Sequence, residues 1–208
     1  MGAEASVFAS FIREGKTCRS HRLLLACDPI RFTEHERAHR CEFDPWITYA
    51  TNHTEPVRNS EASAAGVVAR AAVELTQRFG FCSAVIVPVP PNGGLSRTGV
   101  LCLGSSKPGY FDDDGYVTLR VIARGVAIEL HEWWIQRLRE EIVATSGINP
   151  TDLALLSHEL LGHTTKTIAR QLGVSISSVD SRFQRLNIKL GTRSRKAAAQ
   201  LAAEYGLI

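Results

Sequence analysis

The sequence lacks the features that identify most secreted and membrane-bound proteins. Its five cysteines are odd in number and form no CxxC pair, so we expect free, mostly buried thiols at Cys18, Cys27, Cys41, Cys82 and Cys102. No apolar run approaches the roughly 18 residues of a membrane helix. The N-terminus has neither the basic start nor the long apolar core of a secretory signal. We therefore expect a cytoplasmic protein that does not span a membrane.

Catalytic motifs are also scarce. The chain has no GxSxG motif and no phosphate-cradling glycine-rich loop, because Gly93 and Gly94 fall in a predicted hairpin turn. One segment, residues 35–39, fits the HExxH pattern, in which two histidines bind zinc and the glutamate activates water. A zinc hydrolase is therefore a remote alternative, with Glu55 or Glu61 as the third ligand. We predict a protein that is not an enzyme and that needs no cofactor or metal.

The composition is that of a globular protein whose positive charge lies near its C-terminus. Hydrophobic residues make up 44% and charged residues 22% of the 208 residues. This length accommodates one domain of about 145 residues and one of about 60. Residues 148–208 hold 8 Lys and Arg against 4 Asp and Glu, a net charge of +4, whereas the remaining 16 basic and 17 acidic residues give −1. This asymmetry favours a phosphate-facing module in the tail.

The first 147 residues predict a mixed domain. Residues 21–28, 81–90 and 98–106 have the composition of strands, and the last two are joined by a turn-rich segment. Residues 60–80 predict a helix that begins at a serine and ends at a glycine. We assign no element to the first fifteen residues.

The longest predicted helix covers residues 113–143. Apolar residues recur at helical spacing along it, namely Leu119, Ile122, Val126, Leu130, Trp133 or Trp134, Leu138 and Ile142. The helix is long enough to carry a dimer contact, or it covers one face of the sheet. Asp112, Asp113 and Asp114 lie at its start, where the helix dipole favours carboxylates without any metal.

The tail predicts three short helices with sharp turns between them. Residues 150–162 form the first helix, residues 165–174 a second that stops at Gly173, and residues 175–191 a third that begins at Ser175 or Ser177. The third carries apolar residues three and four apart, which predict one buried stripe: Ile176, Val179, Phe183, Leu186 and Leu190.

The opposite face of the third helix is polar, apart from Ile188. Its residues fit a major groove, whereas the basic residues and Thr165 fit phosphates. We expect base contacts from Ser178, Asp180, Ser181 and Gln184, with Ser177 beside them, and phosphate contacts from Thr165, Lys166, Arg182, Arg185, Lys189 and Arg193.

The tail resembles the DNA-binding domain of LuxR-type (LuxR/FixJ) helix-turn-helix regulators. The matching positions are Pro150, Asp152, Leu156, Gly162, Thr164, Ile168-Ala169, Val179, Lys189-Leu190-Gly191, Arg195 and Gly206-Leu207-Ile208. The resemblance implies an all-α four-helix domain that reads double-stranded DNA at a two-fold symmetric operator as a homodimer. It also implies that Asp180 and Gln184 reach bases, since Gln binds adenine and Asp accepts from cytosine.

LuxR-type regulators pair this reader with an α/β/α sandwich that binds an acyl-homoserine lactone, and residues 1–147 resemble that sandwich more weakly. Asp44 and Pro45 match the family's ligand-binding Asp-Pro pair, and Trp46 follows them. Arg31, His35 and Asn59 stand where the family has two tryptophans and a tyrosine, and Ala84 stands where it has a glycine. The segment before Asp44 is also short.

The resemblance therefore implies an α+β protein of two domains. Residues 1–143 form a sensing and dimerisation domain, 144–149 a linker, and 150–208 the helix-turn-helix domain. Because polar groups replace three aromatic walls of the pocket, we expect a LuxR solo, or orphan, regulator that acts without a lactone or answers to a more polar small-molecule signal. An acyl-homoserine-lactone-responsive quorum-sensing regulator is the alternative.

Overall fold

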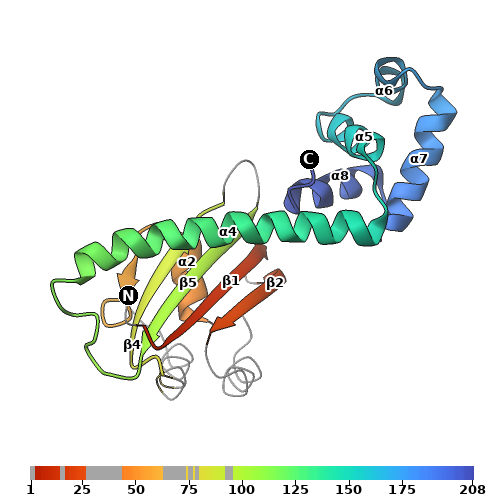
Figure 1. Ribbon diagram of the computed structural model, residues 1–208. Coiled ribbons are helices and arrows are strands. Elements are labelled where there is room, and N and C mark those ends of the chain that lie inside the picture. The colour runs from red at the N-terminus through yellow and green to blue at the C-terminus, as the bar shows by residue number, and fades with distance from the viewer. Residues whose placement is uncertain are drawn as a thin grey trace. The chain divides into compact units, whose positions relative to one another are not determined.

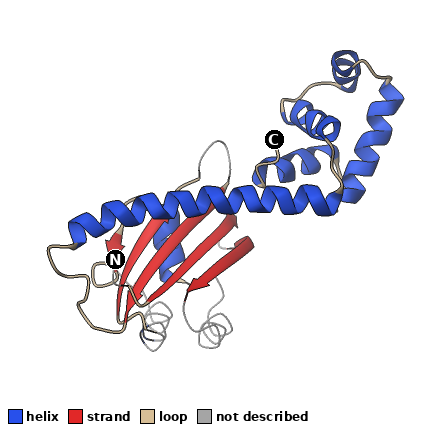
Figure 2. Ribbon diagram, in the orientation of Figure 1, coloured by secondary structure: helices blue, strands red, loops and turns tan. Residues whose placement is uncertain are grey.

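The computed structural model describes residues 3–14, 17–26, 44–62, 74, 77, 80–91 and 96–208. The chain divides into two compact units, Met1–Glu132 and Trp133–Ile208, and the division falls inside the longest helix, α4 (Tyr116–Ser146). All the described strands belong to the first unit, and the second is helical (Figure 2). None of the described helices combines the length and the apolar character needed to cross a membrane.

The first unit contains an antiparallel sheet of five strands in the order β2-β1-β5-β4-β3. Their bounds are β1 Ala5–Glu14, β2 Thr17–Ala26, β3 Val57–Arg58, β4 Ser83–Val89 and β5 Arg97–Ser105. The three predicted strands correspond to β2, β4 and β5. Sequence patterns missed β1, although it lies inside the sheet and pairs Val7 with both Leu25 and Cys102.

Helices cover both faces of this sheet (Figure 1). The short helix α2 (Pro45–Asn52) packs Trp46 and Ala50 against a cluster that includes Phe11 and Ile86. The start of α4 lies on the other face. Because both faces are covered, every residue of β4 and β5 is buried, and these strands show no alternation of apolar and polar residues.

The apolar stripe predicted on α4, either for a dimer contact or for the sheet, coincides only in part with the face of the helix that is buried. Ala123, Ala127 and His131 are buried, whereas Ile122 and Val126 are exposed. Small residues allow the helix to approach the sheet closely. At Gly99 a Cβ atom would lie 2.7 Å from Nδ1 of His131, so a larger residue there would push the helix away.

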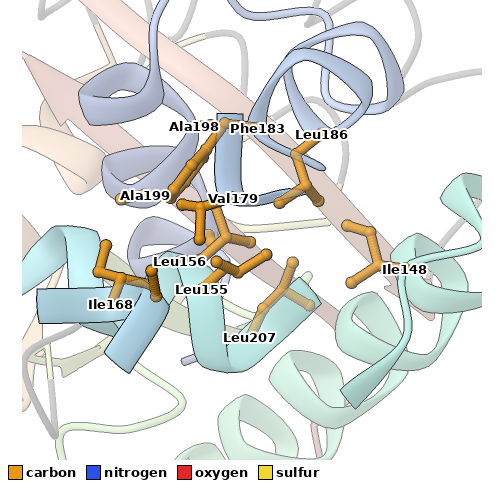
Figure 3. Close-up of a cluster of buried hydrophobic side chains, with 12 residues drawn as sticks. Ile148, Leu155, Leu156, Ile168, Val179, Phe183, Leu186, Ala198, Ala199 and Leu207 are labelled. Carbon is orange, nitrogen blue, oxygen red and sulfur yellow. The ribbon is translucent and has the colours of Figure 1, made fainter. Parts of the chain in front are cut away.

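The second unit packs four short helices around one core. They are α5 (Pro150–Leu160), α6 (Thr165–Leu172), α7 (Ile176–Lys189) and α8 (Arg195–Glu204), and the first three lie where the sequence predicts them. Each helix contributes buried side chains, shown in Figure 3: Leu155 and Leu156, Ile168, Val179, Phe183 and Leu186, and Ala198 and Ala199. The alanines of α8 let it lie close to α5.

Some predictions fall on residues outside the described ranges. They include most of the predicted helix 60–80, the turn at Gly93 and Gly94, and Cys27 and Cys41. Of the cysteines whose side chains are described, Cys102 is buried, Cys82 is half-buried, and both are free.

The buried imidazole of His131 predicts a pH dependence of stability. Burial, and secondarily the charge of Arg97, lowers the pKa of His131 from 6.5 to about 4. As the pH falls below 6.5, His131 becomes protonated in the unfolded chain but stays neutral in the folded chain. The free energy of unfolding therefore falls until about pH 4, and this group has no effect on it above pH 6.5. We expect a loss of up to about 3 kcal/mol from this group. Urea unfolding of the wild type and of His131→Leu across this range measures it.

The variant should lose less stability than the wild type between neutral pH and about pH 4. His53→Gln, which changes an exposed histidine, should behave as the wild type does. Parallel losses in the wild type and His131→Leu would contradict the assignment.

Candidate nucleic-acid interface

The turn between α6 and α7 is fixed by a residue at each end. α6 ends at Gly173, whose φ of 65° lies in the left-handed region that glycine adopts without strain. The Ser175 hydroxyl then accepts the Ser178 N–H at 3.1 Å, which makes Ser175 the N-cap of α7. The Ser177 hydroxyl lies 3.0 Å from that of Ser175. The predicted glycine stop and serine start are both confirmed.

One side of α7 faces the core, and the other faces outward. Val179, Phe183 and Leu186 are buried, and Leu190 is partly buried against the same cluster. The prediction for Ile176 was wrong, because this side chain is 51% exposed. Ile176 is the first residue of α7, and the buried part of the helix begins one turn later. Core packing therefore fixes the orientation of α7 from its second turn onward.

None of the eleven predicted DNA-contacting residues is buried. The exposed ones are Lys166, Ser177, Ser181, Gln184, Arg185, Lys189 and Arg193, and the half-buried ones are Thr165, Ser178, Asp180 and Arg182. They come from α6, α7 and the segment that follows α7. Their hydrogen bonds divide them into side chains with partners inside the unit and side chains that face outward.

Lys189 has partners inside the unit. Its Nζ donates to the carbonyl of Gly147 at 2.6 Å and lies 3.2 Å from the carboxylate of Asp152. That carboxylate is only 9% exposed and accepts the Asn149 N–H, while the Asn149 side chain accepts the Asp152 N–H in a capping box at the start of α5. Lys189 therefore balances a nearly buried charge, a role that the sequence did not indicate.

Arg195, the first residue of α8, was not among the predicted contact residues. One of its guanidinium nitrogens donates to the Thr165 hydroxyl at 2.8 Å, and the other donates to the Asp180 carboxylate at 2.7 Å. Its guanidinium also lies 4.9 Å from the centre of the Phe183 ring. Arg195 thus ties α8 to two of the predicted contact residues, on α6 and α7.

Asp44 and Trp46, two of the predicted ligand-binding residues, have partners within the first unit. The Asp44 carboxylate caps α2 by accepting the N–H groups of Trp46 at 2.8 Å and Ile47 at 3.2 Å. The buried ring of Trp46 packs against Phe81, with 5.6 Å between the ring centres. Burial, and secondarily the charge of Asp44, raises the pKa of the Cys102 thiol well above its usual value. The two hydrogen bonds at the start of α2 fix the position of the Asp44 carboxylate.

Asn59 and Ala84 extend the pairing of β3 with β4. The Asn59 N–H donates to the Ala84 carbonyl at 2.9 Å, and its side-chain oxygen accepts the Ala84 N–H at 3.0 Å. The Asn59 side-chain amide donates to the Cys82 carbonyl at 3.4 Å. Both ends of the amide thus have backbone partners. Arg31 and His35, the other two predicted pocket residues, lie outside the described ranges.

The candidate metal ligands are engaged in ion pairs or fall outside the described part of the chain. Glu55 pairs with Arg120 and Arg124, and Glu61 pairs with Arg58. Among the residues whose placement is described, no group of three or more His, Cys, Asp or Glu side chains is arranged to hold a metal ion. The HExxH segment at 35–39 lies outside these residues, so the zinc alternative stays a sequence prediction.

Two of the three clustered aspartates have local partners. Asp112 lies 3.6 Å from Arg58, and Asp113 accepts the Gly115 N–H at 3.1 Å. α4 begins only at Tyr116, so this cluster precedes the helix.

No protein-family model matches this sequence, and no curated protein matches it. Solved structures do match its fold. A crystal structure of Escherichia coli SdiA matches with a TM-score of 0.70 at 16% identity. The match covers 99% of this chain and 85% of the SdiA chain. A structure of SdiA in complex with octanoyl-rac-glycerol matches with a TM-score of 0.68 at 15% identity. This match covers 99% of this chain and 82% of the SdiA chain. These likenesses establish a common fold along the whole chain.

The contacts of Lys189 predict that its side chain stabilises the helical unit. Lys189→Met leaves the carboxylate of Asp152 nearly buried without its cation, so we expect a loss of about 1–3 kcal/mol in the free energy of unfolding. Arg193→Met removes the same charge from an exposed position and is the matched control. Chemical denaturation compares the two variants. Equal stability of both would show that the Lys189–Asp152 contact contributes nothing.

Proposed function

We propose that this chain is a sequence-specific DNA-binding transcriptional regulator of the LuxR type. In this proposal α6, the turn at Gly173 and α7 form a helix-turn-helix, and α7 is the recognition helix. The observation that carries the proposal is the orientation of α7. Its apolar side is fixed in the core, while Ser181, Gln184 and Arg185 are exposed on the other side. The likeness to SdiA along the whole chain agrees with the resemblance of the tail to LuxR-type regulators.

The predicted contact residues divide into two roles in this proposal. The side chains of Gln184 and Ser181 carry hydrogen-bonding groups that can contact base edges from a helix in the major groove. Lys166, Arg182, Arg185 and Arg193 bind phosphates and position the helix. Base contacts decide which sequence is preferred, whereas phosphate contacts strengthen binding to every sequence.

This division of roles is testable by substitution. Arg185→Ala should weaken binding to all duplexes alike and lower the slope of log affinity against log salt concentration by about 1. Gln184→Ala should instead change the ranking of sequences in a selection from random duplexes. Arg137→Ala removes the same charge from exposed α4 and should change neither property. If the wild type binds no duplex at low salt, the proposed function is wrong.

We further propose that the regulator is a homodimer and that α4 carries the contact. One recognition helix covers only a few base pairs, so readers of this type work in pairs. On α4, Val117, Val121, Gly125 and Ile128 follow the spacing of one helix face, and all four are exposed. A glycine inside a helix, such as Gly125, lowers the stability of the helix. A Cβ added at Gly125 would contact nothing within 4 Å, so packing within the chain does not require a glycine there. A second helix can therefore approach this face closely.

A charge on this face should separate the copies. Val121→Glu changes a side chain that is 69% exposed, so the fold should survive while the dimer dissociates. Sedimentation at micromolar concentration should report a dimer for the wild type and a monomer for the variant. Leu161→Glu, at an apolar residue of the helical unit that is 71% exposed, is the control and should remain dimeric. A wild-type monomer at every concentration would refute the dimer.

For the first unit we propose that the regulator acts without an acyl-homoserine lactone or answers to a more polar small molecule. The support is that Asp44 caps α2 and that Asn59 bonds to backbone groups at both ends of its amide. A lactone would have to displace contacts that hold the fold. A lactone-responsive regulator is the second candidate. The fold shared with SdiA favours an acylated small molecule as the signal, because SdiA was solved in complex with octanoyl-rac-glycerol.

Thermal melting with a panel of acyl-homoserine lactones separates these candidates. Ligands that bind only the folded state raise the melting temperature, so we expect no rise at micromolar lactone. A rise of several degrees with any lactone would favour the second candidate.

A further inference from the structure

The first turn of α8 meets the DNA-facing helices through a single side chain. Arg195 donates to the Thr165 hydroxyl at 2.8 Å and to the Asp180 carboxylate at 2.7 Å, while its guanidinium stacks over the Phe183 ring. Thr165 is the first residue of α6, and Asp180 lies in the second turn of α7. The N-terminal parts of three helices thus share one guanidinium.

Asp180 presents an electrostatic difficulty on a surface that is to meet DNA. Its side chain is 45% exposed, so its negative charge would repel nearby phosphates. In the structure this charge is paired with Arg195, whose side chain is 34% exposed. The pair carries no net charge, and the carboxylate is directed to Arg195.

We propose that Arg195 is a positioning residue of the DNA-binding surface, one that neutralises Asp180 and holds it away from the bases. The inference rests on the proposed function and changes one of its details. Asp180 stands at a position from which a base contact was expected, but its carboxylate accepts from Arg195. Sequence preference is left to Gln184 and Ser181, the exposed residues on the same side of α7.

The same contact orients α6 relative to α7. Thr165 stands at the start of α6, where a phosphate contact is expected, and its hydroxyl oxygen accepts from Arg195. Its own O–H therefore remains available to donate to a phosphate oxygen. Arg195 thus acts on DNA through the side chains that it holds.

A double-mutant cycle in the full-length chain tests the proposal, with duplex binding measured over a range of salt concentrations. Asp180→Asn releases one positive charge, so we expect affinity to rise several-fold for all duplexes, the salt slope to steepen by about 1, and the sequence preference to stay the same. Arg195→Gln leaves the aspartate unpaired and should weaken binding about tenfold or more for all duplexes. Arg193→Gln, the matched control, removes one charge without unpairing an acid and should weaken binding less.

The double variant Asp180→Asn/Arg195→Gln should recover most of the affinity that Arg195→Gln loses. Arg195→Lys should recover part of it, because an ammonium keeps the charge but not the forked geometry that spans both partners. Surface ion pairs contribute little to folding, so all variants should melt within a few degrees of the wild type. A merely structural role would move melting temperature and not the salt slope.

Three results would overturn the inference. A change of preferred sequence in Asp180→Asn would show that Asp180 reads a base. Additive effects of the two substitutions would show that Arg195 binds a phosphate independently of Asp180. Equal losses in Arg195→Gln and Arg193→Gln would show that the pairing has no role. Failure of the wild type to bind any duplex would refute the proposed function instead, so the two failures are distinguishable.

Discussion

The packing of Val179, Phe183 and Leu186 into the core of the helical unit is the constraint on which the candidate interface depends. A helix can present only the side opposite its buried stripe, so these three residues decide which polar residues face outward. The caps at both ends of the preceding turn fix where α7 begins. Among the predicted contact residues, Thr165 and Asp180 are held by Arg195, and Lys189 is held by Gly147 and Asp152.

The helical unit was predictable because its signals are local. Gly173, Ser175 and the three- and four-residue spacing of apolar residues act within a few positions of one another, and all are visible in the sequence. Ile176 was misplaced because periodicity does not show where a helix leaves the core. The partners of Arg195 and Lys189 were missed because they lie 15 or more residues away in the chain. Contacts of that kind are set by tertiary packing.

The first unit was predictable only in part, because some of its strands pair with partners far away in the sequence. β1 owes its place to β2 and β5, and the latter lies about ninety residues further along the chain. α4 was predicted at nearly its observed length, but its apolar stripe coincides only in part with the buried face of the helix. Ala123, Ala127 and His131 meet the sheet instead, and the lack of a side chain at Gly99 leaves room for the imidazole of His131. Hydrophobic periodicity does not show which side-chain sizes allow a helix to pack against a sheet.

The position of Cys102 also has a chemical consequence. Its thiol lies inside the sheet, and burial together with the neighbouring Asp44 disfavours the thiolate. Oxidants and alkylating reagents react with the thiolate form. The Cys102 sulfur is therefore protected both because reagents cannot reach it and because it stays protonated. The centre of the sheet should therefore stay chemically inert under oxidative stress for as long as the chain remains folded, and its sulfur should become reactive only on unfolding.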